Sequence, residues 1–153
     1  STSTRMRRNW RGNTVVTDTR RRRPEQESLF FASQALERVI AEESSTEAWF
    51  ASAHGALRDC TLAVETQLHA LNSPGGIGGD VKRNEPRLLP ALGRLEAALA
   101  RLLVDFWEAE AIPATARPLF VPRLQALADE LRDLANQEWN FVYDVQNEPG
   151  GID

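Results

Sequence analysis

The fold is decided by residues 119–145, which read LFVPRLQALADELRDLANQEWNFVYDV. Apolar side chains recur in this stretch at steps of three and four residues, the spacing of one face of an α-helix. That face consists of Leu124, Leu127, Leu131, Leu134, Phe141 and Val145. Pro122 fits the first turn of such a helix, where its missing N–H is tolerated. The stretch therefore predicts a long amphipathic helix.

The same spacing predicts three more helices upstream, over residues 28–43, 44–72 and 87–111. Pro24 favours the start of the first helix, and Ser44 followed by Glu47 has the pattern of a capping box at the start of the second. The expected core side chains are Leu29, Ala32, Leu36, Val39, Ile40, Trp49, Ala53, Leu57, Cys60, Val64, Leu68, Leu71, Leu88, Leu92, Leu95, Leu99, Leu102, Leu103 and Phe106.

Residues 75–86 hold four glycines and Pro86 between the second and third helices. This glycine run lacks the Lys-Ser/Thr ending of a phosphate-binding loop and has no predicted strand before it. The composition therefore predicts a plain flexible loop. Residues 147–153 read as a Pro-Gly tail, and no segment alternates like a strand.

Four amphipathic helices cannot bury their apolar faces alone, but they can do so together. The sequence therefore predicts an all-α fold, an antiparallel four-helix bundle over residues 25–146. The alternative is a bundle completed by a second copy of the chain in a homodimer.

Composition narrows the class of protein. The 153 residues are 42% hydrophobic and 26% charged, which is typical of one globular domain. One cysteine excludes a disulfide framework, and two histidines exclude a centre that needs several imidazoles. No apolar run approaches the roughly 20 residues of a membrane span. Residues 1–24 contain no apolar stretch typical of a signal peptide. We expect a soluble, cytoplasmic protein.

The charge is divided unequally along the chain. Residues 1–24 contain eight arginines and one aspartate, a net charge of 8 − 1 = +7, so the remainder of a chain of net charge −4 carries −11. A basic arm on an acidic body is typical of an interaction segment, and we expect it to be extended when free. Its predicted partner-binding residues are Arg5, Arg7, Arg8, Trp10, Arg11, Arg20, Arg21, Arg22 and Arg23.

Arginine forks bind phosphate oxygens and carboxylates in the same paired geometry. The arm could therefore bind an acidic protein surface or larger assembly, nucleic acid, or less readily a membrane surface. It could also fold back onto its own acidic body or act as a solubilising tail. Acidic residues for such docking follow two of the predicted helices. They are Asp105, Glu108 and Glu110, and Asp129, Glu130 and Asp133.

Few residues suggest chemistry inside the bundle. Glu65 and His69 are four residues apart on the second helix, which fits a simple helical pair or half of a metal site. Glu138 continues the inward stripe of the fourth helix, unless that stripe drifts outward near the helix end. A buried carboxylate needs a partner, such as an arginine, His69 or a metal.

The two remaining candidates have structural interpretations. His54 is expected at the edge of the core, where it hydrogen-bonds or reaches solvent. Cys60 lies on the apolar stripe and is expected to be an inert core thiol. Two histidines fifteen residues apart on one helix support no catalytic triad.

Several stretches resemble the hemerythrin-like family of HHE cation-binding domains. They are residues 69–76 (HALNSPGG), 84–96 (NEPRLLPALGRLE), 131–138 (LRDLANQE) and 147–153 (NEPGGID). The resemblance covers roughly the last 85 residues and implies a four-helix fold that normally holds two iron ions.

By that resemblance, His69, Glu96 and Glu138 match family positions, whereas Ser73, Ala97 and Leu134 stand where ligands are expected. We therefore expect a degenerate member in which apolar residues fill the former site, with no cofactor, no enzymatic activity and an interaction or scaffold role. The alternatives are a metal-binding or oxygen- or redox-sensing site that uses His69, Glu138, Glu65 and Glu96, or nucleic-acid binding through the arm.

Overall fold

The computed structural model describes residues 24–147, which contain no strand, so the predicted all-α class is confirmed for them. The four long helices are α1 (Pro24–Ala41), α2 (Glu47–Asn72), α4 (Leu89–Glu110) and α5 (Arg117–Asn147). The shorter elements are α3 (Ile77–Asn84) and the 3-10 helices η2 (Pro86–Leu88) and η3 (Ala114–Ala116).

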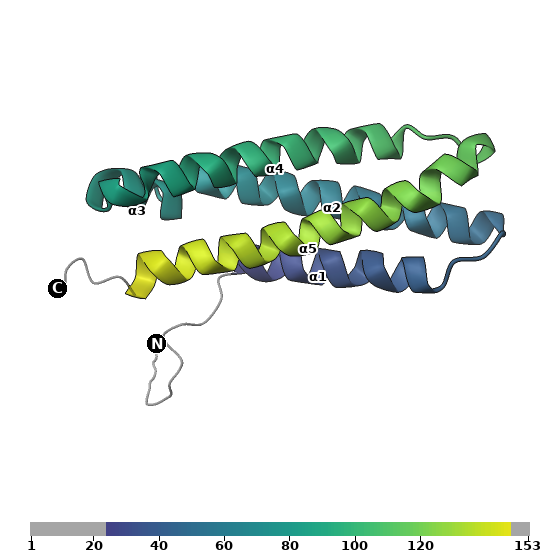
Figure 1. The fold of residues 1–153 in the computed structure, drawn as a ribbon, viewed down its shortest axis with the longest axis horizontal. Coiled ribbons are helices and arrows are strands. Elements are labelled where there is room, and N and C mark those ends of the chain that lie inside the picture. The colour runs from purple at the N-terminus through teal and green to yellow at the C-terminus, as the bar shows by residue number, and fades with distance from the viewer. Residues whose placement is uncertain (1–23, 148–153) are drawn as a thin grey trace, which may run out of the picture.

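The long helices lie side by side, with α3 at one end (Figure 1). α1 packs against α2 and α5, and α4 packs against the same two helices. Each long helix therefore has two neighbours, and its apolar face is removed from water between them. Most of the predicted stripe residues are buried in this core, including Leu124, Leu127, Leu131, Leu134 and Phe141 of α5.

The predicted starts of the second, third and fourth helices differ from the structure. α5 begins at Arg117, so Pro122 lies inside the helix and not in its first turn as predicted. The cap of α2 is Thr46 and not Ser44, because the Thr46 hydroxyl accepts the Trp49 N–H at 3.1 Å. Ser44 instead hydrogen-bonds the Thr46 hydroxyl at 2.8 Å and so supports the cap from outside the helix. The third predicted helix begins with the η2 turn, and Pro90 occupies the first turn of α4, where its missing N–H is tolerated.

The predicted flexible loop at residues 75–86 is wrong, because eight of these residues form α3. This helix packs against α2 and α4, and Ile77, Gly78, Gly79 and Val81 are buried. The glycines allow close backbone approach. A Cβ at Gly78 would lie 1.8 Å from the Leu71 carbonyl oxygen, a separation that no side chain can occupy. Glycine therefore marks tight packing here and not flexibility.

Within residues 24–147, no helix combines the length and the apolar character that crossing a bilayer requires. The apolar residues of the long helices are instead divided between buried and exposed faces.

We predict that Gly78→Ala destabilises the protein. The added methyl group meets backbone and not a movable side chain, so α3 has to shift away from the end of α2. Overpacking of this kind costs about 1–3 kcal/mol. Urea unfolding followed by circular dichroism measures the change.

Gly55→Ala is the matched control, because Gly55 lies inside α2 and a Cβ there meets nothing within 4 Å. This variant should gain up to about 1 kcal/mol from helix propensity. Equal effects of the two substitutions would contradict the packing explanation for Gly78.

Candidate functional site

The predicted partner-binding arginines, together with Trp10, all fall in residues 1–23, outside the part of the chain that the structure describes. Their role therefore stays a prediction. The structure does place the four predicted metal-ligand candidates, Glu65, His69, Glu96 and Glu138.

Glu65 and His69 lie one turn apart on α2, and both are exposed. Val64 and Leu71 are fully buried and belong to the side of α2 that faces the core, whereas Glu65 and His69 do not lie on that side. The pair therefore lies on the outer surface of the helix, in agreement with the interpretation as a simple helical pair.

Glu138 is fully buried on α5. The inward position predicted from the stripe is therefore confirmed, and the alternative of outward drift near the helix end is wrong. Leu134 and Phe141, on either side of it along the stripe, are 6% and 5% exposed. Glu138 is thus a carboxylate enclosed in a predominantly apolar core.

Two further polar atoms are buried near the core. Gln67 of α2 is only 3% exposed, and its Oε1 atom has no hydrogen-bond partner. Glu96 of α4 is half-buried, and its Oε2 atom also lacks a partner. Sequence reasoning missed Gln67, although it lies three residues after Val64 and four before Leu71. That spacing was the signal that could have found it.

Of Ala97 and Leu134, the two residues expected to fill a former site with core, only Leu134 lies in the core. Leu134 is buried, whereas Ala97 is exposed on α4. The buried face of α4 is formed by Leu92, Leu95 and Leu99, and Ala97 is rotated away from it. Ala97 therefore contributes nothing to the filling of the core.

The described residues assemble no recognisable metal-binding group. Within residues 24–147, no set of three or more histidine, cysteine, aspartate or glutamate side chains is arranged to hold a metal ion. The exposed His69 and the enclosed Glu138 illustrate why, since one faces solvent and the other faces the core.

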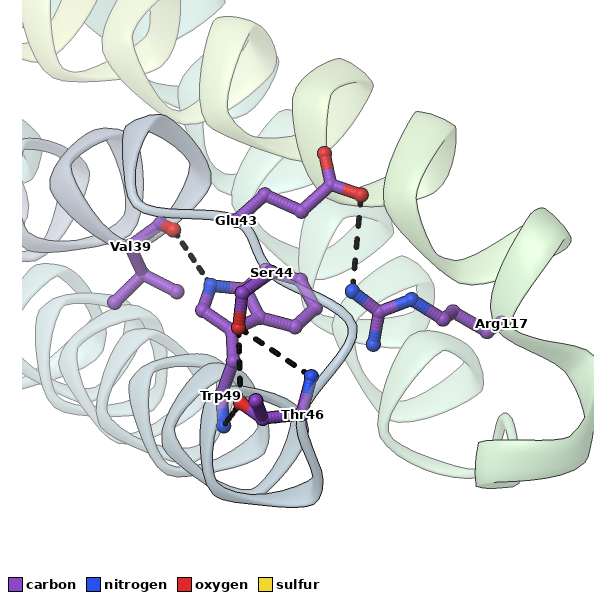
Figure 2. Close-up of polar contacts among 6 residues, drawn as sticks. All are labelled: Val39, Glu43, Ser44, Thr46, Trp49 and Arg117. Carbon is purple, nitrogen blue, oxygen red and sulfur yellow. Dashed lines mark hydrogen bonds and ion pairs between the residues drawn. The ribbon is translucent and has the colours of Figure 1, made fainter.

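A cluster of specific contacts lies at the α1–α2 turn (Figure 2). The Trp49 indole N–H donates to the Val39 carbonyl oxygen at 2.8 Å. The Arg117 guanidinium lies 4.7 Å from the centre of the Trp49 ring, in a cation–π contact, and 3.7 Å from the Glu43 carboxylate. These contacts join the end of α1, the start of α2 and the start of α5.

His54 belongs to the aromatic cluster next to this turn. Its ring stacks on Phe120 with centroids 4.8 Å apart and lies 4.5 Å from the Phe50 centroid. The edge position is confirmed, since His54 is half-buried, but its Nε2 atom makes no hydrogen bond. The expected hydrogen bond or solvent contact is therefore replaced at this atom by ring packing.

Cys60 has the environment predicted for an inert thiol. It is fully buried, and its Sγ atom donates to the Ala32 carbonyl oxygen at 3.5 Å. Burial, with a smaller contribution from the charge of Asp59, raises the pKa of the thiol to about 12. The reactive thiolate is therefore scarce at neutral pH.

Two open grooves follow the helix pairs. One, of about 260 Å³ between α4 and α5, brings the predicted docking residues Asp105, Glu130 and Asp133 together beside Arg101. The other, of about 440 Å³ between α1 and α2, is lined mainly by apolar side chains that include Phe31 and Leu62. The first groove is acidic and the second mainly apolar.

Comparison with known proteins gives no family assignment: no family model, no curated protein and no solved structure matches the chain.

The two histidines should respond differently to substitution. His54→Ala removes a ring packed between Phe50 and Phe120, so we expect a loss of about 1–3 kcal/mol in unfolding free energy. His69→Ala, at an exposed position, should change it by less than about 0.5 kcal/mol. Denaturant unfolding compares the variants, and a larger loss for His69→Ala would contradict the surface placement.

The Cys60 thiol should make stability fall at alkaline pH. Its pKa is about 12 when folded against 9.0 as the ordinary value, so the unfolded chain loses this proton first. The contribution is complete below pH 9 and is lost as the pH rises toward 12. Cys60→Ser removes this titration, and its unfolding free energy should therefore decline less steeply over that range than that of the parent. Parallel slopes would contradict the assignment.

Proposed function

We propose that the four long helices form an antiparallel four-helix bundle of the hemerythrin-like kind, which acts as a non-catalytic interaction or scaffold protein. In this proposal, residues 1–24 bind an acidic surface on a partner protein or assembly. The arrangement of contacts supports the bundle, because each long helix packs against two others and short segments connect them.

The observation that carries the proposal is the charge contrast between residues 1–24, at +7, and the rest of the chain, at −11. Eight arginines within 24 residues provide guanidinium forks that pair with carboxylates. The acidic α4–α5 groove, lined by Asp105, Glu130 and Asp133, offers carboxylates of this kind within the chain itself. Docking of the segment onto its own body is therefore the main competitor of partner binding.

The positions of the candidate ligands support an interaction role over a metal or redox role. His69 is exposed while Glu138 is fully buried, so a shared site would need one of them to change its environment. The buried oxygens of Glu138 and Glu96 are the features that favour the alternative, a reduced metal-binding or oxygen- or redox-sensing site.

Nucleic-acid binding through residues 1–24 is the third candidate. The same arginines pair with phosphates, and this binding would weaken steeply with salt through counterion release. A net charge of −11 on the rest of the chain repels phosphate and makes this candidate the least favoured.

We predict that partner capture depends on residues 1–24. In native pull-downs the full chain should retain acidic proteins that the 25–153 fragment loses, and capture should weaken as salt rises from 50 to about 500 mM because the contacts are screened. Mass spectrometry identifies the partners. Equal capture by both chains would contradict the proposal.

A charge-preserving control separates the contribution of the paired guanidinium hydrogen bonds from that of the positive charge. Replacement of Arg20, Arg21, Arg22 and Arg23 by lysine keeps the charge but removes the paired donors, whereas replacement by glutamine removes both. Lysine should weaken capture partly and glutamine strongly. Duplex DNA as a competitor tests the nucleic-acid alternative, and stoichiometric iron in the purified full chain would favour the metal alternative.

A further inference from the structure

α4 carries a second apolar stripe besides the one that faces the core. Gly93, Ala97, Ala100, Val104 and Trp107 follow one another at steps of four and three residues, and all are exposed. Val104 and Trp107 are 45% and 49% exposed, respectively. This alternation of four and three is the spacing of a helix seam that packs against another helix. We call these five residues the outer seam of α4.

The outer seam has no role in the core of its own chain. The buried stripe of α4, which includes Leu92, Leu99 and Phe106, already faces α2 and α5. A helix at the surface of a single chain normally presents polar residues on its outer face. An uncharged seam across most of α4 therefore indicates a second contact.

Gly93 also supports a second contact on this face of α4. A Cβ at this position would meet no atom within 4 Å, so nothing in the chain requires glycine there. Glycine inside a helix costs up to about 1 kcal/mol relative to alanine. With Ala97 and Ala100 beside it, Gly93 leaves room for close approach of another helix.

The charges on one edge of the seam favour a second copy of α4 as that helix. Arg94 lies seven residues before Arg101, and Glu108 lies seven residues after it, so all three follow the same edge of the seam. The charge therefore changes sign from one end of α4 to the other. An antiparallel second copy of α4 would place Arg94 of each copy opposite Glu108 of the other, which also pairs with Arg123 of its own chain at 3.2 Å. A parallel copy would leave Arg94 and Glu108 about 21 Å apart along the helix axis.

The middle of the seam is compatible with this pairing. Arg101 would lie near the twofold axis, close to its copy, and Asp105 follows one turn later on the same edge. Arg101 and Asp105 both line the α4–α5 groove, where the Asp105 carboxylate lies 3.8 Å from Arg123, so this carboxylate reduces the repulsion between the two Arg101 side chains only in part.

We propose that the outer seam of α4 is the contact between two copies of this chain, packed antiparallel about a twofold axis near Arg101. The proposal rests on α4 alone and is independent of the arginine-rich segment. α4 has 22 residues and is about 33 Å long, so the contact is narrow. We therefore expect a reversible dimer whose population rises with protein concentration.

Sedimentation velocity of the full chain over a wide concentration range is the first test, and a dimer is expected at the upper end. Trp107→Lys should weaken dimerisation by at least about tenfold, because a buried tryptophan is a typical interface hot spot. Phe31→Lys is the matched control, since Phe31 is 60% exposed on the opposite α1–α2 side. A monomer at every concentration, or loss of the dimer only with Phe31→Lys, would overturn the proposal.

A charge exchange and a cross-link test the antiparallel arrangement. Arg94→Glu alone should weaken the dimer, and Arg94→Glu combined with Glu108→Arg should restore it. Gly93→Cys alone should form no disulfide dimer, because residue 93 lies about 12 Å from the axis. Ala111 caps the end of α4 four residues after Trp107 and so continues the spacing of the seam, and Gly93→Cys with Ala111→Cys should form a disulfide dimer. Efficient cross-linking by Gly93→Cys alone would overturn the arrangement. The 25–153 fragment should dimerise like the full chain, so loss of partner capture and loss of the dimer remain distinguishable.

Discussion

The Trp49 side chain connects three of the four long helices, and the arrangement of the structure depends on this junction. Its indole N–H donates to the Val39 carbonyl oxygen near the end of α1. Its ring makes an edge-to-face contact with Phe120 of α5, with the ring centroids 6.3 Å apart, and Arg117 lies over its face. Because both the polar and the apolar parts of the indole are used, the ring has one orientation that satisfies all of its partners. The α1–α2 turn and the start of α5 are thereby fixed relative to each other.

The opposite end of the molecule is organised by backbone approach and not by a large side chain. There the end of α2 turns into α3, and a Cβ at Gly78 or Gly79 would lie 1.8 Å from the Leu71 carbonyl oxygen or 2.1 Å from the Pro74 carbonyl oxygen. Small residues at one end and an aromatic cluster at the other allow four long helices to close a core between them. The core between these ends is mainly leucine, whose packing alone specifies helix register weakly.

The sequence was informative wherever burial decides the outcome. The stripes at steps of three and four residues predicted the long helices. The same rule offered Glu138 as an inward position but left outward drift open, and the structure decides for burial. The start of α2 was predicted wrongly because Ser44 and Thr46 are both good capping residues, and the sequence alone does not decide between them. Residues 77–84 were also predicted wrongly, because glycine composition does not distinguish a flexible turn from a helix packed against backbone. The arrangement of contacts across the aromatic cluster has no signal at all in helical periodicity.

Charge explains how the proposed dimer contact and the basic segment could coexist in one acidic protein. Two bodies of −11 repel each other, so a contact between them needs an apolar seam with local pairing of opposite charges, as Arg94 and Glu108 provide. The +7 of residues 1–24 reduces the charge of each chain to −4 and so reduces this repulsion. If a partner instead neutralises the arginines, each chain again presents a more negative surface. Partner binding and self-association would then oppose each other through long-range electrostatics, without any change in the seam itself.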